Sequence, residues 1–474
     1  MTPNQLTAAA LVIQYWVDRD TVNPGVFIAV FLVVIIAINY LGIKFFGEFE
    51  FWLSSIKVLS IVGLILMSLV IALGGGPDHD RRGFRYWRDP GAFKELYAKG
   101  DAGRFIGLWA SFVTAVFAFL GTELVGVTVG EAQNPRKVIP SAIKLTFWRI
   151  LFFYILSVLL IGMIVPYNSK GLVFASKQTN PGASASPFVV AVGEAGIKSL
   201  PGFMYVNSFL PLLSLPSTHP ILPSPSLPLH PLKPATNPFH SNALILIFVF
   251  SACNSDLYIA TRTLYGLAKE GNAHRIFART DKRGLPVYSL ALCSLIACIA
   301  FLNVADDSKK VFTYFVNLVT IFGLLTWISI LVTHIYFVKA RRAQNIPDSA
   351  LPYTAPLGLW GTYFALAFCI IVSIFKNFEV FVHDPKRDPG LQTFDYKNFI
   401  TGYLGIPLYL GLIAGYKVVK RSKAWGPLAA DFYTGKDVID REEGEYLEKK
   451  AAKMAGKGEG RAGWFYRKFV SWLF

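Results

Sequence analysis

Residues 26–46 read VFIAVFLVVIIAINYLGIKFF, and this stretch decides the fold class. Lys44 is its single charged residue, and its length matches the roughly 20 apolar residues that a helix needs to cross a bilayer. A shorter apolar block lies at residues 6–16. Comparable long blocks follow at residues 53–73, 105–129, 148–165, 242–268, 287–304, 312–338, 357–375 and 399–416. The pattern predicts an all-α polytopic membrane protein with about nine or ten crossings.

The composition of the chain agrees with this fold class. Of its 474 residues 53% are hydrophobic and 16% are charged, and the mean hydropathy is +0.45. A soluble chain of this length would usually carry about 25% charged residues, so the composition disfavours a soluble multidomain enzyme. The net charge of +16 could indicate nucleic-acid binding, but no zinc-finger, RRM or helix-turn-helix pattern accompanies it. We therefore expect the basic residues to face anionic lipid, with no nucleic-acid partner.

The sequence carries no motif for enzymatic chemistry. It has no phosphate-binding glycine loop, no Ser-His-Asp arrangement and no metal-ligand spacing, so we expect no enzyme activity, cofactor or metal site. The four cysteines all lie in apolar segments and are interpreted as helix-packing residues.

The distribution of Lys and Arg predicts the orientation in the membrane. Basic residues cluster in connections that alternate crossings place on one side, which should be the cytoplasm. The loop at residues 77–104 is also basic although it falls on the opposite side. The basic tail, residues 417–474, should then be cytoplasmic. The cytoplasmic clusters comprise Arg136, Lys137 and Lys144; Lys269, Arg275, Arg279, Lys282 and Arg283; and Lys339, Arg341 and Arg342.

One segment breaks the apolar pattern of the transmembrane domain, which we place at residues 1–416. Residues 207–240 include SLPSTHPILPSPSLPLHPLKP, in which prolines recur every few residues. Such a run cannot form a helix. It is either a proline-rich binding linker or a translated intron, and we favour the intron; in both cases we expect disorder.

Three longer motifs resemble fungal amino-acid permeases of the amino acid–polyamine–organocation superfamily. They are FLGTELVGVTVGEAQNPRKVIP at 119–140, SACNSDLYIATRTLYGLA at 251–268 and GIKFFGEFEF at 42–51. The stretches GGGPDHD at 74–80, GFRYWRDPGAF at 83–93 and VTIFGLLTWI at 319–328 are most similar to the dicarboxylic amino-acid subgroup. Many relatives for neutral or cationic substrates carry an acidic residue about where Gln5 stands, and its absence suits an anionic substrate.

The resemblance implies a LeuT-like fold of two inverted five-helix repeats plus two further helices, with the substrate site near the midplane. On that template, the block at residues 6–16 is the back half of the third helix. Helices one and two and the front of the third are then expected to be missing from an amino-terminally truncated gene model. Part of the substrate site would be missing with them, so we expect this chain as written not to transport.

The resemblance also points to one helix as the centre of the substrate site. Broken helices offer free backbone groups and dipole ends to the charged ends of an amino acid. Gly121 weakens its helix, and the rings of Phe117 and Phe119 could cover a substrate. The alternative is a kinked helix with core aromatics. Glu123 should face the bundle, where it either couples gating or protonation to transport or forms a structural pair. The substrate-binding candidates in this helix are Phe117, Ala118, Phe119, Gly121, Thr122 and Glu123.

Three further residues are candidates on other helices. Asn254 and Ser255 form part of a polar group in their helix and are candidate substrate contacts, although such groups also join helices to one another. Lys57 could simply reach the cytoplasmic interface with its ammonium group. Some proton-coupled relatives carry a lysine at the corresponding place, and we therefore assign proton coupling to Lys57 and Glu123. A buried lysine can exchange its proton because burial disfavours the charged form.

Taken with the resemblance, these residues predict a proton-coupled permease that imports amino acids across the plasma membrane. Its partners should be an amino acid as small-molecule substrate, protons and membrane lipids, and glutamate and aspartate are the expected substrates. The alternatives are a general or neutral amino-acid permease and a non-transporting amino-acid sensor built on the same scaffold.

Overall fold

We describe the protein from a computed structural model, which covers residues 1–14, 17, 21–41, 43–131, 134–169, 187–195, 238–304, 308–382, 394–422 and 426–455. These residues form helices joined by turns, and no strand occurs among them. The α-helices are α1 (Thr2–Ile13), α2 (Pro24–Leu41), α3 (Ile43–Ala72), α4 (Gly100–Phe119), α5 (Pro135–Ile164), α7 (Pro187–Glu194), α8 (Pro238–Lys269), α9 (Val287–Ala297), α10 (Ser308–Ala343), α11 (Gly358–Phe375), α12 (Tyr396–Tyr403), α13 (Gly405–Lys420) and α14 (Lys436–Ala455). Shorter helices include η2 (Thr122–Glu131), η7 (Arg275–Ala278), η8 (Cys298–Val304), η10 (Phe378–Phe381) and η11 (Pro427–Ala429).

The long helices confirm the all-α polytopic membrane fold. Within the described residues, 8 helices are long and apolar enough to cross a bilayer. The pair α12 and α13, bent by 41° at its break, adds a ninth if it forms one span. Much of their apolar surface faces outward; Trp360 on α11, for example, is 87% exposed. Lipid is the surrounding medium that such a surface requires.

Several helices differ in extent from the apolar blocks of the sequence. α5 begins at Pro135, well before the block at residues 148–165, and contains Pro140. Pro135 stands at the start of the helix, where a missing N–H is tolerated. α3 likewise extends back to Ile43 and so includes residues 43–51 of the charged motif. The apolar blocks therefore underestimate the lengths of these helices, because polar residues continue each helix beyond its hydrocarbon-facing part.

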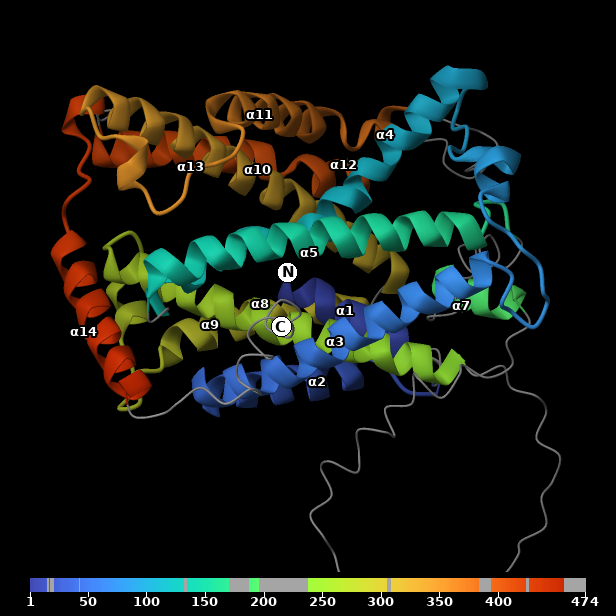
Figure 1. Cartoon of the computed structure of the whole chain (residues 1–474), viewed down its shortest axis with the longest axis horizontal. Helices are drawn as coiled ribbons and strands as arrows, with labels where there is room; N and C mark the ends of the chain where they lie inside the picture. Colours follow the sequence, from blue (N-terminus) through green and yellow to red (C-terminus); the bar gives the residue numbers. More distant parts are fainter. Residues whose placement is uncertain are drawn as a thin grey trace, which may run out of the picture.

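Helix α1 lies in the middle of the bundle. It packs against α8, α2 and α10 (Figure 1). Ala9 and Ala10 are almost fully buried, and small side chains of this kind let helix backbones approach closely. Leu6 joins Ile28 and Leu257 in one apolar core. A second core joins α3, α5 and α7, and a third joins α4, α10 and α11.

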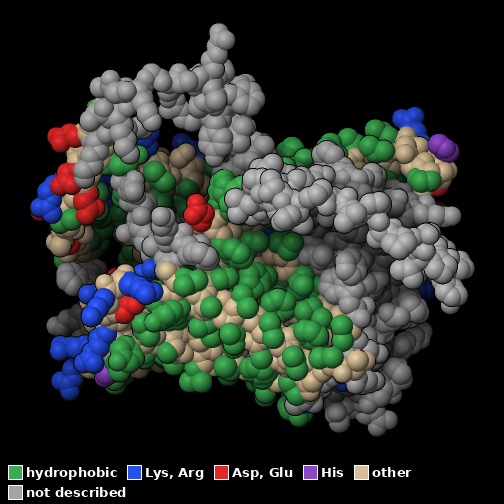
Figure 2. Space-filling view, turned by 90° about the horizontal axis from the view of Figure 1, so that it is seen from below, with side chains coloured by type: hydrophobic (Ala, Val, Ile, Leu, Met, Phe, Trp, Pro, Cys, Tyr) green, Lys and Arg blue, Asp and Glu red, His purple; other side chains and the backbone are tan. Residues whose placement is uncertain are grey.

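On the face drawn in Figure 2, most charged side chains gather at the left edge, and the surface beside them is largely apolar. At one end of the bundle α14 lies across the start of α5 (Figure 1). Arg136 of α5 forms ion pairs with Asp440 at 2.5 Å and Glu443 at 3.1 Å. The Gln344 amide, just beyond α10, donates to the carbonyl of Ala430 at 2.7 Å. The tail is thus attached to two membrane helices at this end.

The proline-rich segment falls largely outside the described residues. Residues 207–237 of the expected insert are not described, and Pro238–His240 belong to the start of α8. The aromatic ending of the tail, residues 464–474, also lies outside the described part.

Candidate functional site

The helix at the centre of the expected site is broken. α4 ends at Phe119, Leu120 is extended with φ −62° and ψ 144°, and Gly121 has φ +97°. That last conformation favours glycine, which lacks a Cβ. η2 then continues the same apolar segment. The break therefore lies inside a candidate membrane span, residues 100–126, at the glycine that the sequence indicated.

Side chains satisfy two of the backbone groups freed by the break. The Tyr154 hydroxyl on α5 donates to the Ala118 carbonyl at 2.9 Å. The Gly121 N–H donates to Glu123 Oε2 at 3.1 Å. The Leu120 N–H still reaches the Phe117 carbonyl at 3.3 Å. These bonds stabilise the break, because unpaired backbone groups within a bilayer cost several kcal/mol each.

Glu123 lies against α10, inside the bundle. Its Oε2 atom also accepts the indole N–H of Trp327 at 3.1 Å. We did not single out Trp327 from the sequence. The available signal was general, since a Trp N–H in an apolar helix usually finds a hydrogen-bond partner.

Close packing brings α10 to the break. A Cβ added at Gly323 would lie 2.1 Å from Leu120 Cδ2 and 3.2 Å from Leu120 Cγ. Gly323 therefore provides the space that the extended residue Leu120 occupies.

The aromatic candidates near the break do not share one environment. Phe119 is 40% exposed, and its ring lies 5.1 Å from that of Tyr154. Phe117 is partly buried, whereas Ala118 and Thr122 are exposed. Phe119 thus packs toward α5.

Asn254 faces α2. It is fully buried, and its Oδ1 accepts from Asn39 Nδ2 at 3.0 Å. Asn39 also donates to the Ile35 carbonyl at 2.9 Å. The Asn254 Nδ2 atom is buried, and no residue in the described part of the chain accepts a hydrogen bond from it. Ser255 is only partly buried. Asn254 therefore joins α2 to α8 through one buried amide pair, which gives it a packing role whatever else it does.

Lys57 lies between α3 and α8. Its Nζ atom is 3.1 Å from Glu50 Oε1 and 2.7 Å from Ser251 Oγ. Within the described residues, no hydrogen bond or ion pair joins Lys57 to Glu123. The two coupling candidates therefore belong to separate polar groups, one at the α3–α8 contact and one at the break.

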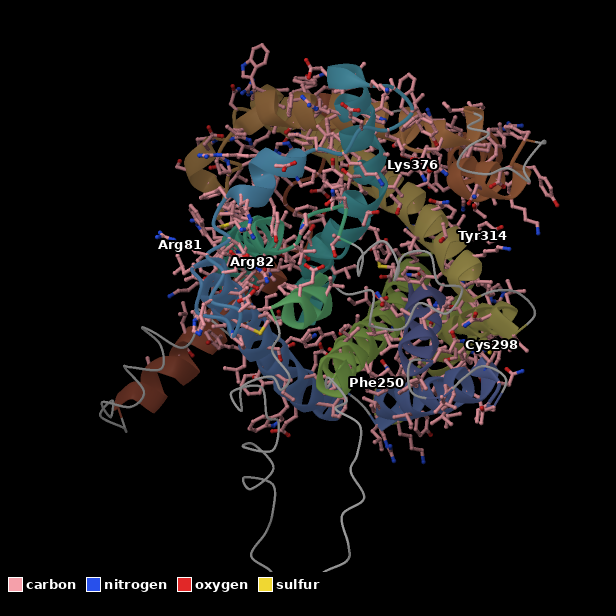
Figure 3. All side chains as sticks on the ribbon, turned by 90° about the vertical axis from the view of Figure 1, so that its right-hand side faces the viewer. Arg81, Arg82, Phe250, Cys298, Tyr314 and Lys376 are labelled. Carbon is pink, nitrogen blue, oxygen red and sulfur yellow. The ribbon has the colours of Figure 1, made fainter. Side chains whose placement is uncertain are left out.

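Lys376 is a buried lysine that the sequence analysis did not identify. Lys376, just after α11, is 1% exposed, and its Nζ donates to Asn377 Oδ1 at 3.0 Å and to the Asn317 carbonyl at 3.3 Å. Asn398 of α12 bonds to both asparagines. Figure 3 places Lys376 well away from Phe250 on α8. This network joins the ends of α10, α11 and α12.

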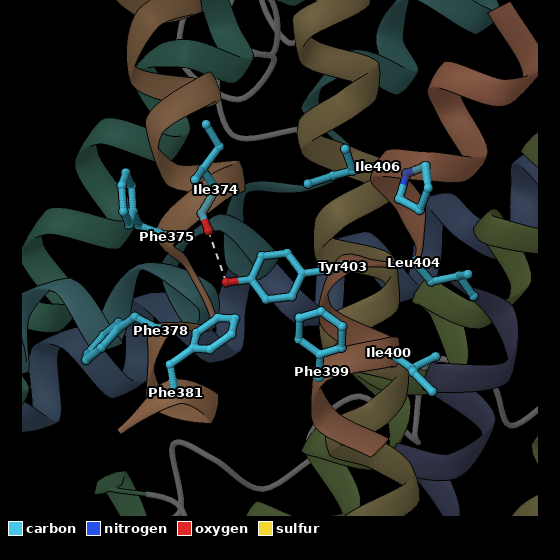
Figure 4. A pocket seen from close by; sticks show the side chains of 10 residues that line it. Ile374, Phe375, Phe378, Phe381, Phe399, Ile400, Tyr403, Leu404 and Ile406 are labelled. Carbon is cyan, nitrogen blue, oxygen red and sulfur yellow. Dashed lines mark hydrogen bonds between the residues drawn. The ribbon is translucent and has the colours of Figure 1, made fainter. Parts of the chain in front are cut away.

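The pocket beside that network suits no amino acid. It has a volume of about 600 Å³ and lies between the end of α11 and α12–α13 (Figure 4). Its lining is aromatic and aliphatic, and the Tyr403 hydroxyl donates to the Ile374 carbonyl at 3.0 Å. An amino acid would find no group there to pair with its carboxylate. No cluster of potential metal ligands occurs among the residues described.

Comparison with known proteins identifies the family. The sequence profile of the amino acid permease family matches residues 1–217 and 234–425. The chain belongs to this family. The match omits residues 218–233, which lie within the proline-rich segment. Membership supports the expected superfamily fold. The relatives of this chain are amino-acid permeases, which are transporters.

Individual permeases differ in specificity. The dicarboxylic amino acid permease of Saccharomyces cerevisiae is 48% identical over 100% of this chain and 71% of its own length. A proline-specific permease of Emericella nidulans is 36% identical over 92% of this chain and 71% of its own length. The general amino-acid permease of S. cerevisiae is 35% identical over 95% of this chain and 67% of its own length.

Proposed function

We propose that this permease imports acidic amino acids, glutamate and aspartate, across the plasma membrane together with protons. The observation that carries the transport role is the break at Leu120–Gly121 inside an apolar span. Broken helices at the midplane supply the dipole ends that bind charged substrates in secondary transporters. The proposed specificity for acidic amino acids rests on the similarity to a dicarboxylic amino acid permease and on the uncharged Gln5.

Within this chain, the break would supply most of the substrate contacts, and two residues of α8 would add to them. An amino acid presents a carboxylate and an ammonium group, and the exposed residues at the break could reach both. Lys57 and Glu123 would carry proton coupling, and the tail would lie in the cytoplasm. The proposed substrate-binding residues are Phe117, Ala118, Phe119, Gly121, Thr122, Glu123, Asn254 and Ser255.

Uptake of radiolabelled glutamate tests this proposal. The full-length gene product is expressed in cells that lack their own permeases, and unlabelled amino acids compete for uptake. We expect aspartate and glutamate to compete best and acidic medium to increase accumulation. Stronger competition by leucine or arginine would refute acidic specificity. Binding without accumulation would instead favour a sensor.

A further inference from the structure

We propose that Glu50 is the positioning residue for the coupling lysine, and that Glu50, Lys57 and Ser251 form one proton-sensitive link between α3 and α8. This inference rests on the proposed proton-coupled import. It adds two residues to which the sequence analysis assigned no role.

The two charged residues share one face of α3. Glu50 and Lys57 are seven residues apart, which is two helical turns. The Lys57 ammonium lies 3.1 Å from Glu50 Oε1. The opposite Glu50 oxygen, Oε2, is buried and has no hydrogen-bond partner among the described residues. Glu50 therefore depends on Lys57 to balance its charge.

Ser251 on α8 contacts both of these charged side chains. Its hydroxyl donates to Glu50 Oε1 at 2.5 Å and accepts from Lys57 Nζ at 2.7 Å. A hydroxyl has one proton to donate, and the Ser251 hydroxyl donates it to the Glu50 carboxylate. Ser251 is fully buried, which means that the contact lies inside the α3–α8 interface.

Neither charged side chain is fully enclosed by the surrounding helices. The Lys57 side chain is 31% exposed and the Glu50 side chain 21% exposed. When an N–H bond of the ammonium breaks and the proton passes to water, Lys57 becomes a neutral amine. Glu50 then remains as a partly buried carboxylate without a counter-charge, which is costly. Release of the proton therefore weakens the link between α3 and α8, and reprotonation restores it.

The helices packed against α3 bring other titratable groups. The Arg262 guanidinium lies over the Tyr258 ring at 5.2 Å, and the Tyr154 hydroxyl is bonded to the Ala118 carbonyl. In the described part of the chain, none of these groups forms an ion pair with Lys57 or Glu50. The titratable groups on the spans of these helices are Tyr40 on α2; Arg136, Lys137, Lys144, Arg149 and Tyr154 on α5; and Cys253, Asp256, Tyr258, Arg262, Tyr265 and Lys269 on α8.

Transport by charge-neutralised variants tests the link. Glu50→Gln and Lys57→Met should each abolish the dependence of glutamate accumulation on external pH. Exchange of external for internal glutamate should remain, because exchange requires no net proton movement. The double variant should be no worse than either single variant, since both remove the same interaction. Glu48→Gln is the matched control: Glu48 lies on the same helix but is exposed.

The outcomes separate this inference from the proposed function. If the unsubstituted protein shows no pH-dependent uptake, the proposed function fails. If the unsubstituted protein shows pH-dependent uptake and Glu50→Gln has an unchanged pH profile and unchanged accumulation, only the role of Glu50 is refuted. If Glu50→Gln fails to reach the membrane, the pH profiles of Glu50→Asp and Ser251→Ala test the link in its place. A pH profile unchanged in Ser251→Ala would overturn the link, whereas a shifted profile with retained exchange would support it.

Discussion

Trp327 on α10 and Glu123 after the break in α4 are joined by a 3.1 Å hydrogen bond from the indole N–H to the carboxylate. The same carboxylate oxygen accepts the Gly121 N–H. One atom of Glu123 thus connects the start of η2, the break and α10. Any movement of α10 relative to the break must stretch or replace this bond, so the bond ties the conformation of the proposed site to its neighbour.

The first prediction concerns that bond. Trp327→Phe keeps an aromatic ring but removes the N–H, and a hydrogen bond to a charged group contributes about 1.5–3 kcal/mol. If the bond holds the break in its binding conformation, the KM for glutamate should rise about tenfold or more. Concentration-dependent uptake measures this. Trp360→Phe, at an 87% exposed position, serves as the control and should behave as the parent. An unchanged KM in Trp327→Phe would separate the bond from binding.

The second prediction concerns the close approach of α10 to the break. Gly323→Ala places a Cβ against Leu120 and should reduce transport, because overpacking costs about 1–3 kcal/mol. Adding Leu120→Ala should restore part of the activity by returning the space. Gly411→Ala on α13 has open space around its Cβ and should be neutral. Failure of the double variant to recover, with normal amounts at the cell surface, would contradict this packing argument.

A third prediction separates the packing and binding roles of Asn254. Asn39→Ala removes the amide that bonds to Asn254. Its expected effect is a lower thermal stability by about 0.6–2 kcal/mol, with KM unchanged. Asn254→Ala should lower stability similarly. If it also raises the KM several-fold, Asn254 contacts substrate as proposed; if only stability changes, its role is confined to joining α2 and α8. Thermal unfolding in detergent and uptake kinetics provide the two measurements.

A fourth prediction concerns the tail helix α14. Arg136→Ala should release α14 from α5 and increase its cleavage by added protease. The effect on stability should be small, about 0–1 kcal/mol, because both ion pairs are partly exposed. High salt should mimic the substitution, since salt screens exposed charges. Arg441→Ala, on α14 itself, serves as the control. Equal protease resistance of Arg136→Ala and the parent at low salt would show that these pairs do not hold the tail.

Much of the fold followed from local chemistry. Long apolar blocks predict helices and membrane insertion because the backbone must satisfy its own hydrogen bonds in lipid. Gly121 marked the break because a glycine weakens a helix and permits a positive φ. The pairing of Glu50 with Lys57 could also have been predicted, because two turns of a helix place such residues on one face.

The contacts between helices had no such local signal. Trp327 meets Glu123 across 204 positions of the sequence, Asn39 meets Asn254 across 215, and Lys57 meets Ser251 across 194. Helical periodicity identifies which residues share a face, but not which other helix that face meets or at what height. The sequence by itself determined the helices, the membrane and the broken segment, because these depend on neighbours along the chain. Only the tertiary structure decided the polar partners, because they depend on how the helices pack together.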